Sequence, residues 1–282
     1  ICVIPLNSKS FICRDSNNPD ALDLSKGFNI VVGGNTLGRG ITFPHLQTVY
    51  YCRSSKMPQA DTFWQHSRIF GYDREKELVR IYIPRTLHSL FVSLNEANEI
   101  LIKQIENGIE NIQVIYPNGI KPTRKNVLDN QYLNMIVGGA NMFANNPISQ
   151  YTKDIDSIVE QYINTEYSDV SAEILIKILK LTGSSVHSDF DSNKYIACIK
   201  ALQEKRPTIK YRLIVRTNRD ISKGTGTLLS PTDRRLGDSF KNDITLTIYR
   251  VNGSTDKGWD GSPLWIPNIK FPDGICFYNI DE

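Results

Sequence analysis

The sequence is poor in the residues that build metal centres, disulfide frameworks and membrane spans. Its five cysteines are scattered, odd in number and without a Cys-x-x-Cys pair, which argues against a disulfide framework and against a zinc site. The four histidines are isolated and lack the spacing of metal ligands. No apolar run approaches the roughly 20 residues that a membrane-spanning helix needs. We therefore expect a reduced, cytoplasmic setting, no resident metal and no contact with a membrane.

The excess of positive over negative charge is small, and nuclease motifs are also sparse. Thirty-three Lys and Arg against thirty Asp and Glu give a net charge of +3, which is too small to indicate nucleic-acid binding by itself. None of the thirty acidic residues has a lysine two positions later, so the Asp/Glu-x-Lys tripeptide common in restriction-type nucleases is absent. A metal-dependent DNA endonuclease of an unfamiliar type stays open as an alternative.

The densest functional pattern lies in residues 28–74. Its first half, FNIVVGGNTLGRGITFP, predicts an apolar strand that ends at two glycines, and such glycines let the backbone approach an anion. The loop is not a Walker loop, because Gly38 is followed by Arg39 and Gly40 instead of Lys and Ser/Thr. The positions that would meet a nucleotide or couple it to DNA are Gly33, Gly34, Asn35, Thr36, Arg39, Gly40 and Thr42.

The second half of this segment, DTFWQHSRIFGYDR, predicts a helix followed by a turn. The helix places Gln65 and Arg68 almost one turn apart, and the turn ends at Arg74. Arginine suits phosphate because its planar guanidinium stays charged and binds two phosphate oxygens at once. The pattern therefore predicts a surface that completes a phosphate site held mainly by something else.

These two segments resemble the fifth and sixth motifs of superfamily-two helicases. The wider pattern, GGNxLxRGxT, a following strand that ends at Arg53, DTxxQxxRxFGY and then LVRIYIP, is similar to the Z-one domain family over about residues 1 to 116. That family consists of bacterial proteins with a superfamily-two helicase region, often named as candidate endonucleases of restriction or defence systems. Two positions differ from its pattern: Ser67 stands where the family usually has Gly, and Asp73 separates Tyr72 from Arg74.

The resemblance implies ATP-driven movement or remodelling of DNA. ATP and Mg²⁺ would be bound mainly by another RecA-like lobe with a Walker loop, which we expect upstream of Ile1 because the chain opens inside an apolar run. In catalysis, Arg68 would be the arginine finger, with Arg74 as the second candidate, and Gln65 would help to position the contact. The residues that would couple nucleotide to DNA include Thr36, Arg39, Thr42 and Arg53.

The order of apolar segments predicts an α/β chain with three parts. Residues 1–116 alternate strands with crossovers, which is typical of a parallel sheet and predicts a partial RecA-like lobe. Residues 117–205 read as a connector followed by a helical subdomain, including SAEILIKILKLTG and NKYIACIKALQEK. Residues 206–282 contain KYRLIVRT, DITLTIYRV and ICFYNI, which predict a β-rich domain.

Basic residues gather in this C-terminal part and raise the question of a DNA-binding face. The candidates for phosphate contact are Arg216, Arg219, Arg234 and Arg235. The alternative is a solvated sheet edge protected by charge. A further hypothesis is that the whole chain is a non-catalytic DNA-binding module whose RecA-like half serves only as a scaffold.

Overall fold

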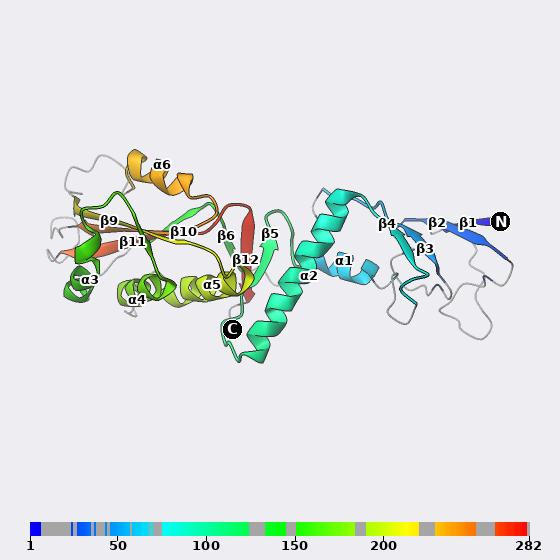
Figure 1. The fold of residues 1–282 in the computed structure, drawn as a ribbon, viewed down its shortest axis with the longest axis horizontal. Coiled ribbons are helices and arrows are strands. Elements are labelled where there is room, and N and C mark those ends of the chain that lie inside the picture. Colours follow the sequence, from blue (N-terminus) through cyan, green and yellow to red (C-terminus); the bar gives the residue numbers. More distant parts are fainter. Residues whose placement is uncertain are drawn as a thin grey trace. The chain divides into compact units, whose positions relative to one another are not determined.

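The computed structural model describes residues 1–6, 24, 27–34, 37, 43, 46–56, 58–67, 69, 75–123, 133–144, 151–183, 190–219, 229–251 and 263–280. It divides into two compact units, Ile1–Asn95 with Gly119–Asn130 and Glu96–Asn118 with Gln131–Glu282. Figure 1 labels the elements of both units.

The first unit contains two pairs of parallel strands. β1 (Cys2–Leu6) pairs with β2 (Asn29–Gly33), and β3 (Thr48–Tyr50) pairs with β4 (Arg80–Tyr82). Within the described ranges, no ladder joins the two pairs. The parallel direction agrees with the sequence-based prediction, but a RecA-like sheet is not shown. One reason is that β3 and β4 are three residues long and offer few ladder hydrogen bonds to a further strand.

Helix α1 (Ala60–Ser67) and the first part of α2 (Arg85–Glu106) supply a small aromatic core in this unit. Ala60, Phe63 and His66 are buried at a spacing of three residues, so they share one face of α1. In α2, the Phe91 ring contacts Phe63 and Tyr51 edge to face, with centroids 5.1 and 5.6 Å apart. This contact attaches α1 to α2 and to the residue that follows β3.

The second unit is built on a five-stranded mixed sheet with the order β7 (Asn141–Phe143), β11 (Leu264–Lys270), β10 (Ile244–Val251), β9 (Tyr211–Arg219) and β8 (Ser168–Val170). Strands β9 and β10 are parallel, and the other neighbours are antiparallel. A second, antiparallel sheet has the order β5 (Val114–Pro117), β12 (Ile275–Ile280) and β6 (Leu133–Val137).

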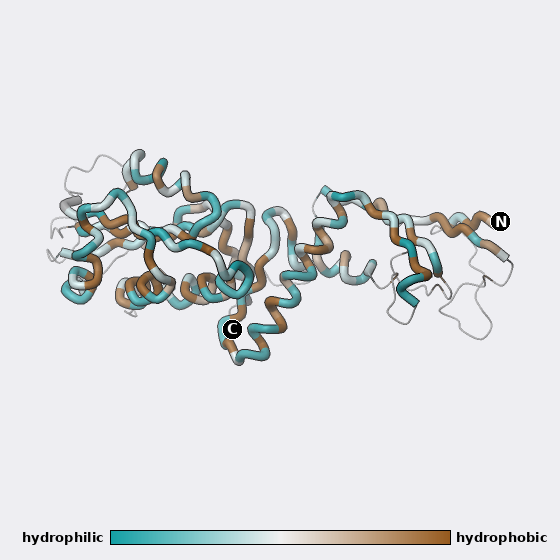
Figure 2. The backbone as a smooth tube through the Cα atoms, viewed as in Figure 1, coloured by the Kyte–Doolittle hydropathy of each residue, from teal (hydrophilic) through white to brown (hydrophobic). Residues whose placement is uncertain are grey.

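Helices lie on both faces of the five-stranded sheet, as Figure 1 shows. One side carries α3 (Thr152–Val159), the 3-10 turn η3 (Glu160–Tyr162), α4 (Ala172–Thr182) and α5 (Ser192–Lys205). The other side carries α6 (Pro231–Ser239). The central strands β10 and β11 are buried along almost their whole length, and Figure 2 shows their hydrophobic residues between the helices.

The main hydrophobic core joins the helices to the C-terminal strands. Leu175 and Ile178 of α4 pack in one cluster with Ile199 of α5, Leu213 of β9 and Ile248 of β10, each of them fully buried. The apolar faces of α4 and α5 are thus buried against the sheet. In the described part of the chain, no helix has the length and apolar character needed to cross a membrane.

Candidate functional site

The structure describes only part of the phosphate site predicted in residues 28–74. Gly33 and Gly34 lie at the end of β2, Gln65 lies in α1 and Arg53 follows β3. The remaining predicted residues, Asn35, Thr36, Arg39, Gly40, Thr42, Arg68 and Arg74, fall outside the described residues. Their roles stay predictions.

Gly33 is required by the packing of the first strand pair. It is the register partner of Leu6, and a Cβ atom placed on it would lie 2.6 Å from the Leu6 carbonyl oxygen. A Cβ on the neighbouring Gly34 would meet nothing within 4 Å. The sequence predicted a close approach to an anion at these glycines, which stays a prediction; the described close neighbour of Gly33 is the adjacent strand β1.

His66 is the best-defined polar group of the first unit. It is 2% exposed, and both of its ring nitrogens are engaged. Nδ1 lies 2.9 Å from the Tyr51 hydroxyl, and Nε2 lies 2.7 Å from Nη1 of Arg53. Burial is the larger influence on the Tyr51 hydroxyl and raises its pKa, although the nearby Arg53 charge acts in the opposite direction. No partner of His66 was predicted from the sequence, but its i, i+3, i+6 spacing with Ala60 and Phe63 was a signal that it faces inward.

Gln65, the predicted partner of the arginine finger, is half-buried in α1. Its Oε1 atom is buried and has no hydrogen-bond partner among the described residues. A buried amide oxygen of this kind is costly unless another group completes it. The position therefore suits a residue whose partner arrives with a ligand or another lobe.

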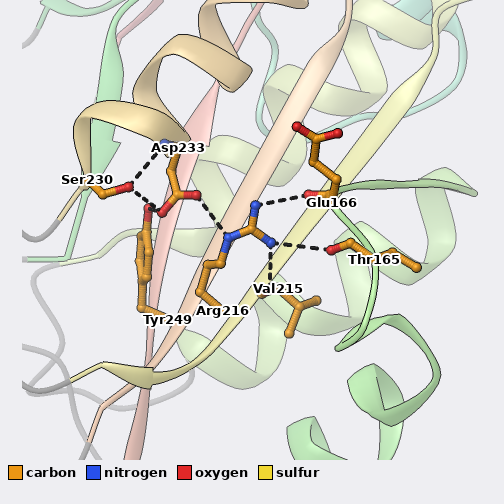
Figure 3. Close-up of polar contacts among 7 residues, drawn as sticks. All are labelled: Thr165, Glu166, Val215, Arg216, Ser230, Asp233 and Tyr249. Carbon is orange, nitrogen blue, oxygen red and sulfur yellow. Dashed lines mark hydrogen bonds and ion pairs between the residues drawn. The ribbon is translucent and has the colours of Figure 1, made fainter.

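The second unit contains a closed polar network around Asp233 (Figure 3). The Asp233 carboxylate accepts hydrogen bonds from Arg216 Nε at 2.9 Å, Ser230 Oγ at 2.8 Å and the Tyr249 hydroxyl at 3.1 Å. Burial raises the pKa of Asp233, but the hydrogen bonds from Ser230, Arg216 and Tyr249, with the Arg216 charge, outweigh it and hold that pKa below its usual range. The carboxylate therefore stays charged and fixes the start of α6 to β9 and β10.

The Arg216 side chain, predicted to contact DNA, makes four hydrogen bonds to partners within this unit. Besides Asp233 it donates to the carbonyl oxygens of Thr165 (3.4 Å), Val215 (2.9 Å) and Glu166 (3.0 Å), as Figure 3 shows. Its arrangement is that of a residue that ties α6 and the turn before β8 to the sheet.

Three further basic residues of this sheet are also paired with carboxylates inside the unit. Arg212 is paired with Asp169 and with Asp243, and its guanidinium lies over the Tyr167 and Phe240 rings. Arg250 is bound in a bidentate manner by Asp156, which also accepts from Trp265. Lys270, with only 5% of its side chain exposed, donates to Asp238. Arg216, Arg212, Arg250 and Lys270 thus have internal structural partners.

Two basic residues of helix α6 differ from these paired residues. Asp233 and Gly237, four residues apart, are buried against the sheet, so Arg234 and Arg235 are turned outward and exposed. Neither side chain has a hydrogen-bond or ion-pair partner within the described ranges. Arg219 belongs to β9, but its side chain lies outside what the structure describes. Two predicted DNA-binding residues are therefore placed on an anchored helix with their charge available to solvent.

Comparison with known proteins divides the chain between two families. Residues 136–273, which contain the whole five-stranded sheet, α3 to α6 and the last two residues of β6, match the model of the C-terminal domain of the restriction endonuclease CglI H-subunit. A solved structure titled C-terminal domain of CglI restriction endonuclease H subunit is 30% identical over 49% of this chain and 99% of its own, with a TM-score of 0.41. The chain belongs to this family.

The CglI H-subunit family match covers Arg216, Arg234 and Arg235, while the first unit has a different relative. Residues 3–127 match the model of the Z1 domain. This range contains Arg53, Gln65 and His66. This match confirms the Z-one part of the resemblance seen in the sequence. A search among curated proteins gives no match.

Proposed function

We propose that this chain is a component of a bacterial restriction or defence system that acts on DNA in the cytoplasm. The observation that carries the proposal is the adjacency of two matches on one chain, a Z1 domain over residues 3–127 and the C-terminal domain of a restriction endonuclease subunit over residues 136–273. A protein of the second kind is, by its description, one subunit of a restriction endonuclease, so we propose that this chain also works with partner subunits.

Within that system, we propose that the Z1 part completes an ATP site as half of a helicase or translocase. The resemblance of GGNTLGRGIT and QHSRIFGYDR to helicase motifs supports this role. Because this loop lacks a Walker lysine, another lobe would bind most of the ATP and its Mg²⁺. Transfer of the γ-phosphoryl group of ATP would supply the energy. Arg68, with Arg74 as the second candidate, would reach the γ-phosphate, and Gln65 would position that contact.

The residues that the structure describes fit such a partial site. Gln65 keeps a buried acceptor without a partner, and Arg53 is a half-buried cation without a carboxylate partner among the described residues. Both features suit a surface that is completed by a ligand or a second lobe. The coupling roles of Gly33, Gly34 and the loop that follows them belong to the same proposal.

For the C-terminal part, we propose that α6 contacts the DNA backbone through Arg234 and Arg235. Their exposure and their lack of partners in the described part of the chain support this role, since phosphate contact needs cations that are not already neutralised. Arg216 would act indirectly by holding α6 in place. The same observation favours the second candidate function, a non-catalytic DNA-binding module in which the Z1 part is a scaffold.

ATP hydrolysis by the full-length protein, measured with and without DNA, tests the motor proposal. Arg68→Ala should lower turnover by about 10³ to 10⁵, the typical effect of losing an arginine finger. Arg85→Ala, at an exposed position at the start of α2, is the matched control and should change turnover less than about twofold. Retention of more than half of the activity by Arg68→Ala would reject the assignment, and DNA binding without any ATP hydrolysis would favour the non-catalytic module.

A further inference from the structure

Hydrogen-bond chemistry fixes the protonation state of His66. A guanidinium group has donors and no acceptor, so Nη1 of Arg53 donates to Nε2, which must carry the lone pair. The ring proton is then on Nδ1 and is donated to the Tyr51 hydroxyl oxygen. A protonated imidazolium would place a donor against a donor and two cations 2.7 Å apart. His66 is therefore neutral, in the Nδ1–H tautomer.

The positive charge of Arg53 has no counter-charge in the part of the unit that the structure describes. No carboxylate there lies within ion-pair distance of it. Asp61, on the same helix as His66, already accepts hydrogen bonds from Thr62 and from Thr123. Burial favours the neutral form of Tyr51, so this residue does not act as a counter-ion. The described contacts of Arg53 thus leave its Nε and Nη2 donors for another acceptor.

The His66 ring is held rigidly. The Tyr51 ring packs edge to face against it, with centroids 5.9 Å apart, and Phe91 of α2 supports Tyr51 from another direction. Since His66 itself is 2% exposed, its ring has little room to rotate. The Nε2 acceptor is consequently fixed in direction and holds one edge of the half-buried guanidinium in place.

A half-buried arginine that is oriented by a neutral acceptor, without a carboxylate, is arranged to receive an anion. An arginine already paired with Asp or Glu, such as Arg250, would have to give up that partner first. A pre-oriented guanidinium binds phosphate oxygens through charge-assisted hydrogen bonds.

We propose that His66 is a positioning residue that holds Arg53 as a receptor for a phosphate group. The phosphate comes from a nucleotide or from the DNA backbone. Only the choice between these two sources rests on the proposed function. The Tyr51 hydroxyl secures the tautomer of His66, so that the three side chains Tyr51, His66 and Arg53 act as a relay from the aromatic core to the ligand.

Binding of phosphate probes to the 282-residue chain tests this relay. The probes are MgATP, inorganic tripolyphosphate and a short blunt DNA duplex, each titrated by calorimetry or fluorescence anisotropy. Arg53→Ala and His66→Leu should each lower the affinity for whichever probe binds the unchanged chain by about tenfold or more, the scale of a lost charge-assisted hydrogen bond. His66→Gln, whose amide oxygen can still accept from Arg53, should stay within about threefold of the unchanged chain. Arg80→Ala, an exposed arginine of β4, is the control and should change nothing.

Nitrogen-15 spectra of the histidine side chains give a second, independent measurement, and the chain has only four histidines to resolve. We expect His66 to show the Nδ1–H tautomer in the unchanged chain and to lose this preference in Arg53→Ala. Circular dichroism of each variant identifies misfolding, and Tyr51→Phe, which keeps the ring packing, provides a gentler test if His66→Leu does not fold.

The outcomes separate this inference from the proposed function. An Nε2–H tautomer, or a folded His66→Leu chain that binds every probe like the unchanged chain, overturns the relay. Weakening of MgATP and tripolyphosphate but not of duplex DNA supports the relay at a nucleotide site, and weakening of duplex DNA alone supports it at a DNA site. If the relay passes these tests while the full-length protein hydrolyses no ATP, the motor proposal fails and the phosphate receptor stands.

Discussion

Replacement of Asp233 by asparagine should destabilise the second unit strongly, because its carboxylate is the common acceptor for three donors. Arg216 Nε, Ser230 Oγ and the Tyr249 hydroxyl all donate to it, and its side chain is only 5% exposed. An asparagine has one acceptor oxygen in place of two, and its NH₂ group would face donors. The substitution removes the Asp233 acceptor from the hydroxyl of Tyr249, a residue that is 0% exposed, or from the Arg216 guanidinium.

The magnitude follows from these contacts. Breaking a buried ion pair by removing one partner costs about 3–5 kcal/mol. The loss should lie near the lower end, about 3 kcal/mol, because Arg216 keeps the carbonyl oxygens of Thr165, Val215 and Glu166 as acceptors. Urea unfolding followed by far-UV circular dichroism measures it, with Glu204→Gln on the exposed side of α5 as the control, expected within about 0.5 kcal/mol.

The pH dependence of this difference gives the sign of the electrostatic part. The pKa of Asp233 is lowered in the folded state, so its stabilisation is present above the unfolded pKa of about 3.9 and is lost as pH falls through the folded value. The gap in unfolding free energy between the unchanged chain and Asp233→Asn should therefore be constant near neutral pH and shrink below about pH 4. A loss under about 1 kcal/mol at neutral pH, or a gap that widens in acid, would refute this account of the network.

Two further predictions concern the helix that carries the exposed arginines and the first strand pair. The double substitution Arg234→Ala with Arg235→Ala should weaken duplex DNA binding and lower the slope of log affinity against log salt by about two, without changing thermal stability; an unchanged slope would remove α6 from the DNA contact. Gly33→Ala should destabilise the first unit by about 1–3 kcal/mol because its Cβ would lie 2.6 Å from the Leu6 carbonyl, whereas Gly34→Ala, with open space around it, should change it less; equal effects at both positions would contradict the packing role.

Several elements could be predicted from the sequence because their signals are local. The helix predicted within DTFWQHSRIFGYDR corresponds to α1, and KYRLIVRT, DITLTIYRV and ICFYNI overlap β9, β10 and β12. Strand β11 escaped notice because Pro267 stands in its middle, where a proline usually excludes a strand. Helix α6 was not predicted, although Ser230 followed by Pro231 is a helix-start signal, an N-cap serine with proline at the first helical position.

The candidate sites show the same division between local and distant information. The motif pattern alone singled out Gln65 and Arg53, but it could not identify the partner of His66, because Tyr51 and Arg53 come from a strand end 15 and 13 residues away. Nor could it distinguish a paired arginine from an exposed one. The partner of Arg250 is 94 residues distant in the chain, and that of Arg216 is separated from it by 17.

Periodicity and residues close together in the chain were enough to predict the types and approximate places of most helices and strands, the family resemblance of the first part and the inventory of basic residues. That the helices share one core with the C-terminal strands, and which cations are neutralised, became visible in the folded chain. Burial and ion pairing depend on which surfaces meet in space. Arg216 is therefore neutralised beside Asp233 and anchors α6, whereas Arg234, the next residue after Asp233 in the chain, is an exposed charge on the outer face of α6.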